Sequence, residues 1–108
     1  MTFDAFQQEA MATAIYADEL RLIYPALGLA GETGEVLEKI KKLYRDDNGQ
    51  VSDEKRLAIS HELGDVLWYV AAVCRDLDIS MSDCSKLVIQ KLRSRAARGT
   101  LKGSGDER

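Results

Sequence analysis

Hydrophobic residues recur at helical spacing along most of this chain of 108 residues. Near the N-terminus they fall three or four residues apart, as they do on one face of a helix. These positions are Phe3, Phe6, Ala10, Ala14 and Ala17. Thr2 precedes them and is a residue type that caps the start of a helix. The pattern therefore predicts a first helix from Thr2 to about Leu22.

A second helix is predicted to begin at Pro25, because the first turn of a helix tolerates the missing N–H of proline. This helix should run to about Arg45. The sequence 'DDNGQ' that follows, residues 46–50, contains the Asn and Gly that are typical of a helix end and a loop. The residues of this helix that we expect to be buried are Leu27, Val36, Ile40 and Leu43.

Two more helices follow the loop. Ser52 and Asp53 can cap a third helix, which should run to about Leu77. Ser80 or Ser82 can start a fourth helix. The apolar faces are predicted to contain Leu63, Val66, Leu67, Val70 and Val73 in the third helix, and Leu87, Val88 and Leu92 in the fourth.

The fold class follows from these elements. The chain contains one proline, and four helices joined by short loops indicate an all-α fold of the four-helix-bundle type. One domain is expected over residues 1–98, with the fourth helix ending near Gly99. The remaining segment, 'TLKGSGDER', is polar and rich in glycine. We therefore expect a tail at residues 99–108 that is mobile without ligand and closes over bound ligand.

Composition excludes several classes of function. Hydrophobic residues make up 45% of the chain, which is typical of a globular protein. A net charge of −3 without a basic face argues against nucleic-acid binding as the main activity. The N-terminus lacks the cationic start and apolar run of a signal peptide, and the longest apolar run, near 'VLWYVAAVC', is too short to cross a bilayer. We expect a cytoplasmic protein with no membrane or nucleic-acid partner, in which Cys74 and Cys84 are free thiols.

The stretch 'GLAGETGEVLEKIKK' interrupts an apolar run with three glycines and several acids. A Gly inside a helix costs roughly 1 kcal/mol relative to Ala, so something should compensate for it. Glu32 and Glu35 are three residues apart and share one face of the predicted helix, and Glu38 is three residues further along. A solvated, salt-bridged face explains Glu38 well through its i,i+4 pair with Lys42. It explains Glu35 only partly through Lys39.

A second acid pair lies in the third helix, within 'HELGDVLWYVAAVC'. Glu62 and Asp65 are three residues apart, and an unpaired carboxylate between the core-like neighbours of Asp65 would be costly. If the acid-bearing faces of the two helices meet, four oxygen ligands converge, which suits a hard cation such as Mg²⁺ or Mn²⁺. These ligands are Glu32, Glu35, Glu62 and Asp65. The neighbouring glycines are Gly28, Gly31, Gly34 and Gly64. They would allow the helices to approach closely or leave room for a bulky anionic ligand.

The two acidic motifs, in this order and spacing, resemble those of the MazG-like all-α nucleoside triphosphate pyrophosphohydrolases, which carry ExxE on one helix and ExxD on the next. The resemblance covers the chain from about Tyr24 to its end. It implies a hydrolase that uses Mg²⁺, with Mn²⁺ as a substitute, to convert NTP or dNTP to the monophosphate and pyrophosphate. The four acids would be the metal ligands. Our choice for the carboxylate that orients or deprotonates the attacking water is Glu35, with Glu32 as the alternative. Family members form dimers or tetramers, which implies a homo-oligomer here, with a tetramer favoured.

Three further residues are candidates for binding the nucleotide. Lys91 and Arg98 lie on the fourth helix, and the resemblance favours both as contacts to phosphate. A solvated basic helix end explains them equally well. Tyr69 lies one turn beyond Asp65 and is either a contact to the sugar or base or a core tyrosine.

Two rival functions stay open from the sequence. One is a non-catalytic helical interaction module whose acids hold a structural cation or a basic partner. The other, a di-iron carboxylate bundle, is disfavoured because it would need Glu-x-x-His on two helices. The only histidine, His61, directly precedes Glu62 and is expected at the surface. Trp68 is expected in the core or at an interface.

Overall fold

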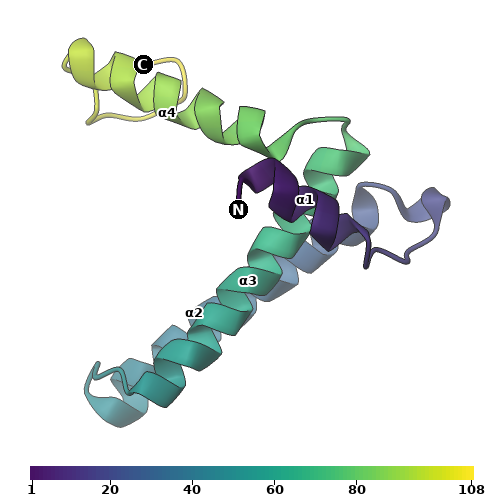
Figure 1. The fold of residues 1–108 in the computed structure, drawn as a ribbon. Coiled ribbons are helices and arrows are strands. Elements are labelled where there is room, and N and C mark those ends of the chain that lie inside the picture. Colours follow the sequence, from purple (N-terminus) through teal and green to yellow (C-terminus); the bar gives the residue numbers. More distant parts are fainter.

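Four α-helices and no strands make up the computed structural model, which describes residues 1–108 (Figure 1). In chain order they are α1 (Phe3–Met11), α2 (Ile23–Asp47), α3 (Asp53–Asp76) and α4 (Met81–Ala97), with one turn of 3₁₀ helix at Asp18–Leu20. The all-α prediction is confirmed. The helix boundaries differ from the prediction mainly near the N-terminus.

Helices α2 and α3 form a long antiparallel pair that runs through most of the fold (Figure 1). Asn48 ends α2 in the left-handed conformation, with φ 55°, and the N–H of Gly49 donates to the carbonyl of Leu43 at 2.9 Å. Ser52 caps α3, because its hydroxyl oxygen accepts from the N–H of Lys55 at 3.2 Å. The loop and cap expected from the sequence therefore have the predicted roles.

The first helix is much shorter than predicted, because it ends at Met11 instead of continuing to Leu22. The hydroxyl of Thr13 donates to the carbonyl of Ala10 at 2.6 Å, and the indole N–H of Trp68 donates to the same oxygen at 3.1 Å. These two side chains take the carbonyl that the next helical turn would use, so the helix stops. Apart from the 3₁₀ turn, the chain from there to Leu22 is irregular.

Helix α1 ties α3 to α4. The side-chain amide of Gln7 donates to the carbonyls of Ala71 at 3.3 Å and Ile79 at 3.1 Å, and its oxygen accepts from the N–H of Met81 at 3.0 Å. The small core around this junction comprises Ala10, Ala71 and Met81, with Phe6, Met11, Trp68 and Val70 packed against them. Trp68 is therefore partly buried and packs against this core.

Helix α4 leads away from the other three helices (Figure 1). It packs against α1 and α3. The residues of α4 that we predicted to face inward are instead exposed: Leu87, Val88 and Leu92. That prediction is wrong for the single chain, because no element of the chain covers this face. The radius of gyration of the Cα atoms, 16.8 Å, exceeds the value of about 13 Å that is typical of a compact domain of this length.

The α2–α3 pair also leaves apolar surface uncovered. Val36 and Leu43 are buried as predicted, but Leu27 and Ile40 are exposed, contrary to the prediction. The chain exposes 7917 Å², about a third more than the ~6,000 Å² expected for a folded monomer of 12.0 kDa. Large apolar side chains that stay exposed together on a helix face mark a surface that binds another molecule.

Helix α3 is long and apolar enough to cross a membrane by length and composition alone, with a mean hydropathy of 1.3 over its best 18-residue window. Any such window of this helix contains both Glu62 and Asp65. In the fold, α3 packs against both α1 and α2, and 17% of the window is buried within the chain; a single helix of this kind is weak evidence for a membrane span. This helix therefore does not indicate a membrane protein.

The C-terminal tail folds back along α4 (Figure 1). The carboxylate of Asp106 accepts from Nζ of Lys91 at 3.2 Å, and the backbone carbonyl of Asp106 accepts from the guanidinium of Arg95 at 2.9 Å. These contacts give the tail a defined position against the helix. Its mobility, and the division of the chain at residue 98, stay predictions.

Candidate functional site

Three of the four predicted carboxylates come together where α2 and α3 face each other. Glu32 of α2 and Glu62 and Asp65 of α3 each place one carboxylate oxygen within 4.8 Å of the others. Acids three residues apart share a helical face, and the packing of the antiparallel pair brings that face of α3 to α2. Glu32 and Glu62 are half-buried, whereas Asp65 is exposed in the single chain. His61 is exposed, as predicted, and lies outside the cluster.

Glu35, the fourth predicted ligand, lies one turn beyond Glu32 on α2 and is exposed. It is not a member of the three-residue cluster. Its negative charge is nevertheless close enough to contribute to the raised pKa of Glu32. Glu35 therefore lies beside the cluster rather than within it.

The cluster concentrates negative charge that the chain offsets only in part. The pKa of Glu32 is raised above its usual 4.5, first by burial, then by a hydrogen bond with Glu62 and by the charges of the other acids. The cation paired with the cluster is Lys39, whose Nζ lies 3.6 Å from an oxygen of Glu62. Converging carboxylate oxygens are the ligands that Mg²⁺ and Mn²⁺ take in proteins. The residues present therefore fit a divalent cation.

A pocket of about 360 Å³ opens directly beside the carboxylates. Its lining includes two of the acids and four aromatic side chains, which are Glu32, Asp65, Tyr16, Tyr24, Trp68 and Tyr69. The rings of Tyr16 and Tyr24 stack with centroids 4.8 Å apart, and Trp68 meets Tyr69 edge to face at 5.0 Å. A cavity lined by aromatic side chains and by acids suits a ligand that combines a flat ring with a group that binds cations.

Comparison with known proteins shows the family of the chain. Residues 25–99 match the model of the MazG nucleotide pyrophosphohydrolase domain. The chain belongs to this family. It is also 42% identical, over 114 aligned positions that span all of both chains, to the Gene 37 protein of Mycobacterium phage L5. No solved structure matches the chain.

From the sequence, the glycines near the acids were expected either to allow close packing of the helices or to leave room for a ligand, and the glycines of this MazG domain differ in this respect. A Cβ at Gly28 would lie 2.1 Å from the ring of Tyr69, so glycine allows the ring to rest on the backbone of α2. A Cβ at Gly31, Gly34 or Gly64 would meet nothing within 4 Å. Gly28 therefore permits close packing, whereas the other three border open space near the acids.

Tyr69 lies in the pocket wall of the MazG domain. Its pKa is raised, first by burial and then by Tyr24 and the nearby acids. The hydroxyl therefore stays protonated and can donate a hydrogen bond. Sequence reasoning singled out Tyr69 but missed Tyr16 and Tyr24. No periodic pattern could have revealed Tyr16, because it lies in the irregular segment before α2.

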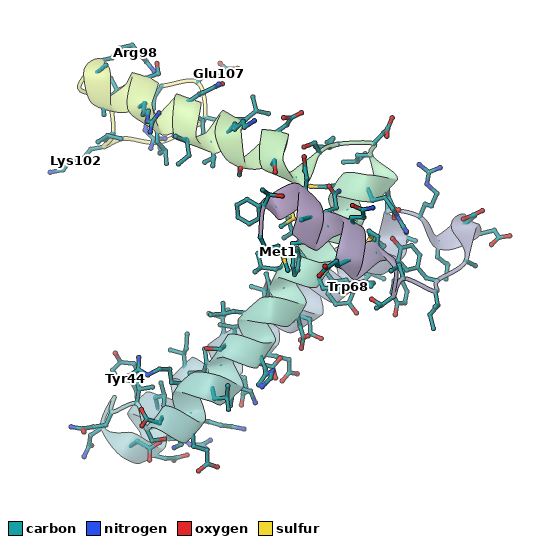
Figure 2. All side chains as sticks on the ribbon, viewed as in Figure 1. Met1, Tyr44, Trp68, Arg98, Lys102 and Glu107 are labelled. Carbon is teal, nitrogen blue, oxygen red and sulfur yellow. The ribbon has the colours of Figure 1, made fainter.

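Lys91 and Arg98 lie away from the MazG acids of the same chain. Lys91 is on α4 and Arg98 is the residue that caps its C-terminus, and Figure 2 shows Arg98 at the end of α4 that is far from Trp68. Lys91 pairs with Asp106 of the tail, and Nε of Arg98 donates to the hydroxyl of Ser94 at 3.1 Å. A single protomer therefore does not bring these cations to the carboxylate cluster.

Proposed function

We propose that the chain is a nucleoside triphosphate pyrophosphohydrolase, which hydrolyses NTP or dNTP to the monophosphate and pyrophosphate. The observation that carries this proposal is the convergence of Glu32, Glu62 and Asp65 beside an aromatic pocket, which Glu32 and Asp65 help to line, in a MazG domain. A nucleotide has the two matching halves, a flat base and a polyphosphate that binds divalent cations.

The shape of the pocket supports one orientation of the nucleotide. The aromatic end, with Tyr16 and Tyr24, would take the base, because stacking of a base on an aromatic side chain is worth about 1–3 kcal/mol. Glu32 and Asp65 border the same pocket, so the phosphate nearest to them would be the one attached to the sugar. This orientation supports attack at the α-phosphorus. The hydroxyl of Tyr69 would donate to the sugar or the base.

Glu32, Glu62 and Asp65 would hold Mg²⁺, with Mn²⁺ as a substitute. Such an ion supplies Lewis-acid activation of water and neutralises charge on the triphosphate. The pKa of Glu32 is raised first by burial and then by the neighbouring acids, which supports this assignment, because a bound cation would favour the charged form of the carboxylate and relieve the repulsion. Glu35 would complete the set of ligands when its side chain turns towards the cluster.

Glu35 is also our candidate for the carboxylate that orients the attacking water. It lies next to the cluster but outside it, so it is the acid least committed to holding a cation. Its oxygen would accept a proton of the water while the water oxygen bonds to the α-phosphorus. The bond from the α-phosphorus to the bridging oxygen breaks, and pyrophosphate leaves with the electron pair.

We propose that the site is completed by a homo-oligomer, with a tetramer favoured over a dimer. The surplus exposed surface and the apolar face of α4 support assembly, since a standard interface buries about 800 Å² per partner. Docking of that face on the α2–α3 pair of another subunit would carry Lys91 and Arg98 with it. Both would then serve as charged donors to the phosphates.

A panel of NTPs and dNTPs with Mg²⁺ tests the proposal, with monophosphate and pyrophosphate followed separately. Turnover in ¹⁸O-labelled water should place the label in the monophosphate, because the water oxygen bonds to the α-phosphorus. Label in pyrophosphate, release of nucleoside diphosphate, or no turnover of any nucleotide would contradict it.

The alternative is a non-catalytic helical interaction module with a structural cation site. The uncovered apolar faces of α2, α3 and α4 are the observation that favours it. A module of this kind would gain stability from Mg²⁺ or Mn²⁺ and would release no pyrophosphate from any nucleotide. The same panel, combined with thermal melting, separates the two functions.

A further inference from the structure

The irregular segment between α1 and α2 ends in a strained turn. Leu22 has φ 65° and ψ −51°, and the N–H of Ile23 donates across it to the carbonyl of Arg21 at 2.7 Å. This is the geometry of the γ-turn with positive φ at its central residue, which is the rarer and more strained of the two γ-turn forms. Such backbone persists only where surrounding contacts hold it, and it gathers at ligand sites. The contacts that hold Leu22 therefore indicate what the turn is for.

Asp76, the last residue of α3, holds the turn from within the protein. Its side chain is 2% exposed. Its Oδ2 accepts from the N–H of Leu22 at 3.0 Å and from the hydroxyl of Tyr16 at 2.9 Å, and its Oδ1 accepts from Nε of Arg75 at 3.3 Å. Burial raises the pKa of Asp76, but these hydrogen bonds outweigh burial, and the net pKa is below the usual 3.8. The carboxylate is therefore charged at neutral pH and bonded through both oxygens.

Tyr16 connects this buried carboxylate to the pocket. Its hydroxyl is bonded to Asp76, while its ring lines the pocket and stacks on Tyr24. Arg75 reinforces the position, because its guanidinium donates to the Tyr16 hydroxyl at 2.9 Å and lies 5.4 Å from the ring centroid. One buried charge thus fixes both the strained end of the segment and the aromatic ring that faces the ligand.

We propose that Asp76 is a positioning residue for nucleotide recognition, holding residues 13–22 as one wall of the pocket through the N–H of Leu22 and the hydroxyl of Tyr16. The inference rests on the proposed function, because the pocket is taken to bind the nucleoside. Asp76 is not part of the metal-binding cluster and does not line the pocket. It acts on substrate affinity and leaves the chemistry of the carboxylates unchanged.

The first test replaces Asp76 with Asn, which has nearly the same shape but presents an NH₂ group where an acceptor is needed. KM for the best nucleotide should rise roughly tenfold, with kcat within about twofold of wild type. The Kd of the α,β-methylene analogue of that nucleotide, which cannot be cleaved at this bond, should rise in parallel. Hydrogen exchange at the Leu22 amide should become faster. Asp78→Asn is the matched control, because Asp78 is exposed and lies two residues further along.

A second variant, Tyr16→Phe, keeps the ring and removes the hydroxyl that Asp76 accepts from. Its KM should rise less than that of Asp76→Asn, because the bond to Leu22 remains. The double variant should have the same KM as Asp76→Asn alone, since both substitutions disrupt the same contact, the one between Asp76 and the Tyr16 hydroxyl. Multiplied effects in the double variant would overturn the proposed route through Tyr16.

The outcomes separate this inference from the proposed function. Wild-type KM and Kd in Asp76→Asn, or a smaller amount of active protein with unchanged KM, would overturn the positioning role. If Asp76→Asn does not fold, the KM of Tyr16→Phe tests the proposal instead. An unchanged KM in Tyr16→Phe would overturn the positioning role as well. Wild-type protein that binds the analogue but releases no pyrophosphate would contradict the hydrolase. The Kd comparison would then still decide the role of Asp76.

Discussion

The ring of Tyr69 rests on the backbone of Gly28, so closely that a Cβ at residue 28 would come 2.1 Å from a ring carbon. This contact joins α2 to α3 in the wall of the aromatic pocket. Among the glycines that accompany the acidic motifs, Gly28 is the one that packing within the chain requires. The contact also allows the pocket to be altered without touching a carboxylate.

Gly28→Ala should therefore damage the pocket. The added methyl displaces the ring of Tyr69, and overpacking of this kind costs about 1–3 kcal/mol of stability. We expect a lower melting temperature and a higher KM, with the stabilisation by Mn²⁺ retained. Gly31→Ala on the same helix is the control, because its Cβ meets nothing within 4 Å and Ala favours a helix by up to about 1 kcal/mol. Equal losses in both variants would count against the Tyr69 contact as the cause.

Removing one charge from the carboxylate cluster should abolish turnover. Asp65→Asn and Glu62→Gln should each lower kcat by roughly two or more orders of magnitude, since each removes a ligand from a site built on charge. Circular dichroism should stay helical. Glu38→Gln is the control, because Glu38 pairs with Lys41 at 2.9 Å on the same helix as Glu32 and outside the cluster. Near-normal turnover of Asp65→Asn at saturating Mg²⁺ would show that the ligand assignment is wrong.

Divalent cations should stabilise the protein. A cation that binds only the folded chain adds about 2.7 kcal/mol at a concentration of 100 times its Kd. Mn²⁺ should raise the melting temperature, and EDTA should reverse the rise. Glu32→Gln should melt higher than wild type without metal, because a carboxyl whose pKa is raised is destabilising when charged. The same variant should gain less from Mn²⁺. Identical melting curves in EDTA and millimolar Mn²⁺ would exclude a functional cluster.

Much of the fold could be predicted from local signals in the sequence. The boundaries of α2 and α3 follow from Pro25, the Asn-Gly loop and the cap at Ser52. The two acid pairs predicted a carboxylate cluster between α2 and α3, because spacing on a helix fixes which side chains share a face, and three of the four acids, all except Glu35, form one. Cys74 and Cys84 are free thiols, as expected. These features depend on residues close together in the chain.

The parts that could not be predicted depend on contacts between distant residues. The first helix stops early because Trp68, 58 residues along the chain, takes the carbonyl of Ala10. Tyr16, which lines the pocket, donates from its hydroxyl to Asp76, 60 residues away along the chain. The direction of α4 could not be predicted from the apolar spacing either. The spacing indicates that the face containing Leu87 should be covered, but it does not show whether the same chain or another chain covers it.

Acid should weaken the contribution of Asp76 to stability. A group whose folded pKa is lowered stabilises the fold above its unfolded pKa and loses that contribution as the pH falls through both values. The difference in unfolding free energy between wild type and Asp76→Asn should therefore shrink as the pH is lowered from about 6 to about 3. Urea denaturation at several pH values measures it, with Asp78→Asn expected to follow wild type. A difference independent of pH would mean that the charge of Asp76 is not what holds the turn.

The tail contact predicts that Asp106 competes with phosphate. Its carboxylate accepts from Lys91 at 3.2 Å and lies 3.4 Å from Arg95, and its pKa is lowered, chiefly by the hydrogen bond from Lys91. A carboxylate bound to two cations takes the place that a phosphate oxygen would take. Asp106→Asn should therefore lower KM by roughly two- to threefold at low salt, and the effect should fade as salt screens exposed charges.

Glu107→Gln provides the matched control for the tail, because it removes the same charge from the neighbouring residue, which forms no ion pair. It should leave KM at the wild-type value. Deleting Lys102 to Arg108 then shows whether the tail raises or lowers KM. A tail that competes with phosphate predicts a lower KM after deletion, because Lys91 and Arg95 are released. A tail that closes over bound nucleotide predicts a higher KM or a lower kcat, because part of the closed site is lost. Unchanged kinetics in both the deletion and Asp106→Asn would exclude competition and closure together, and would leave the carboxylate site unaffected.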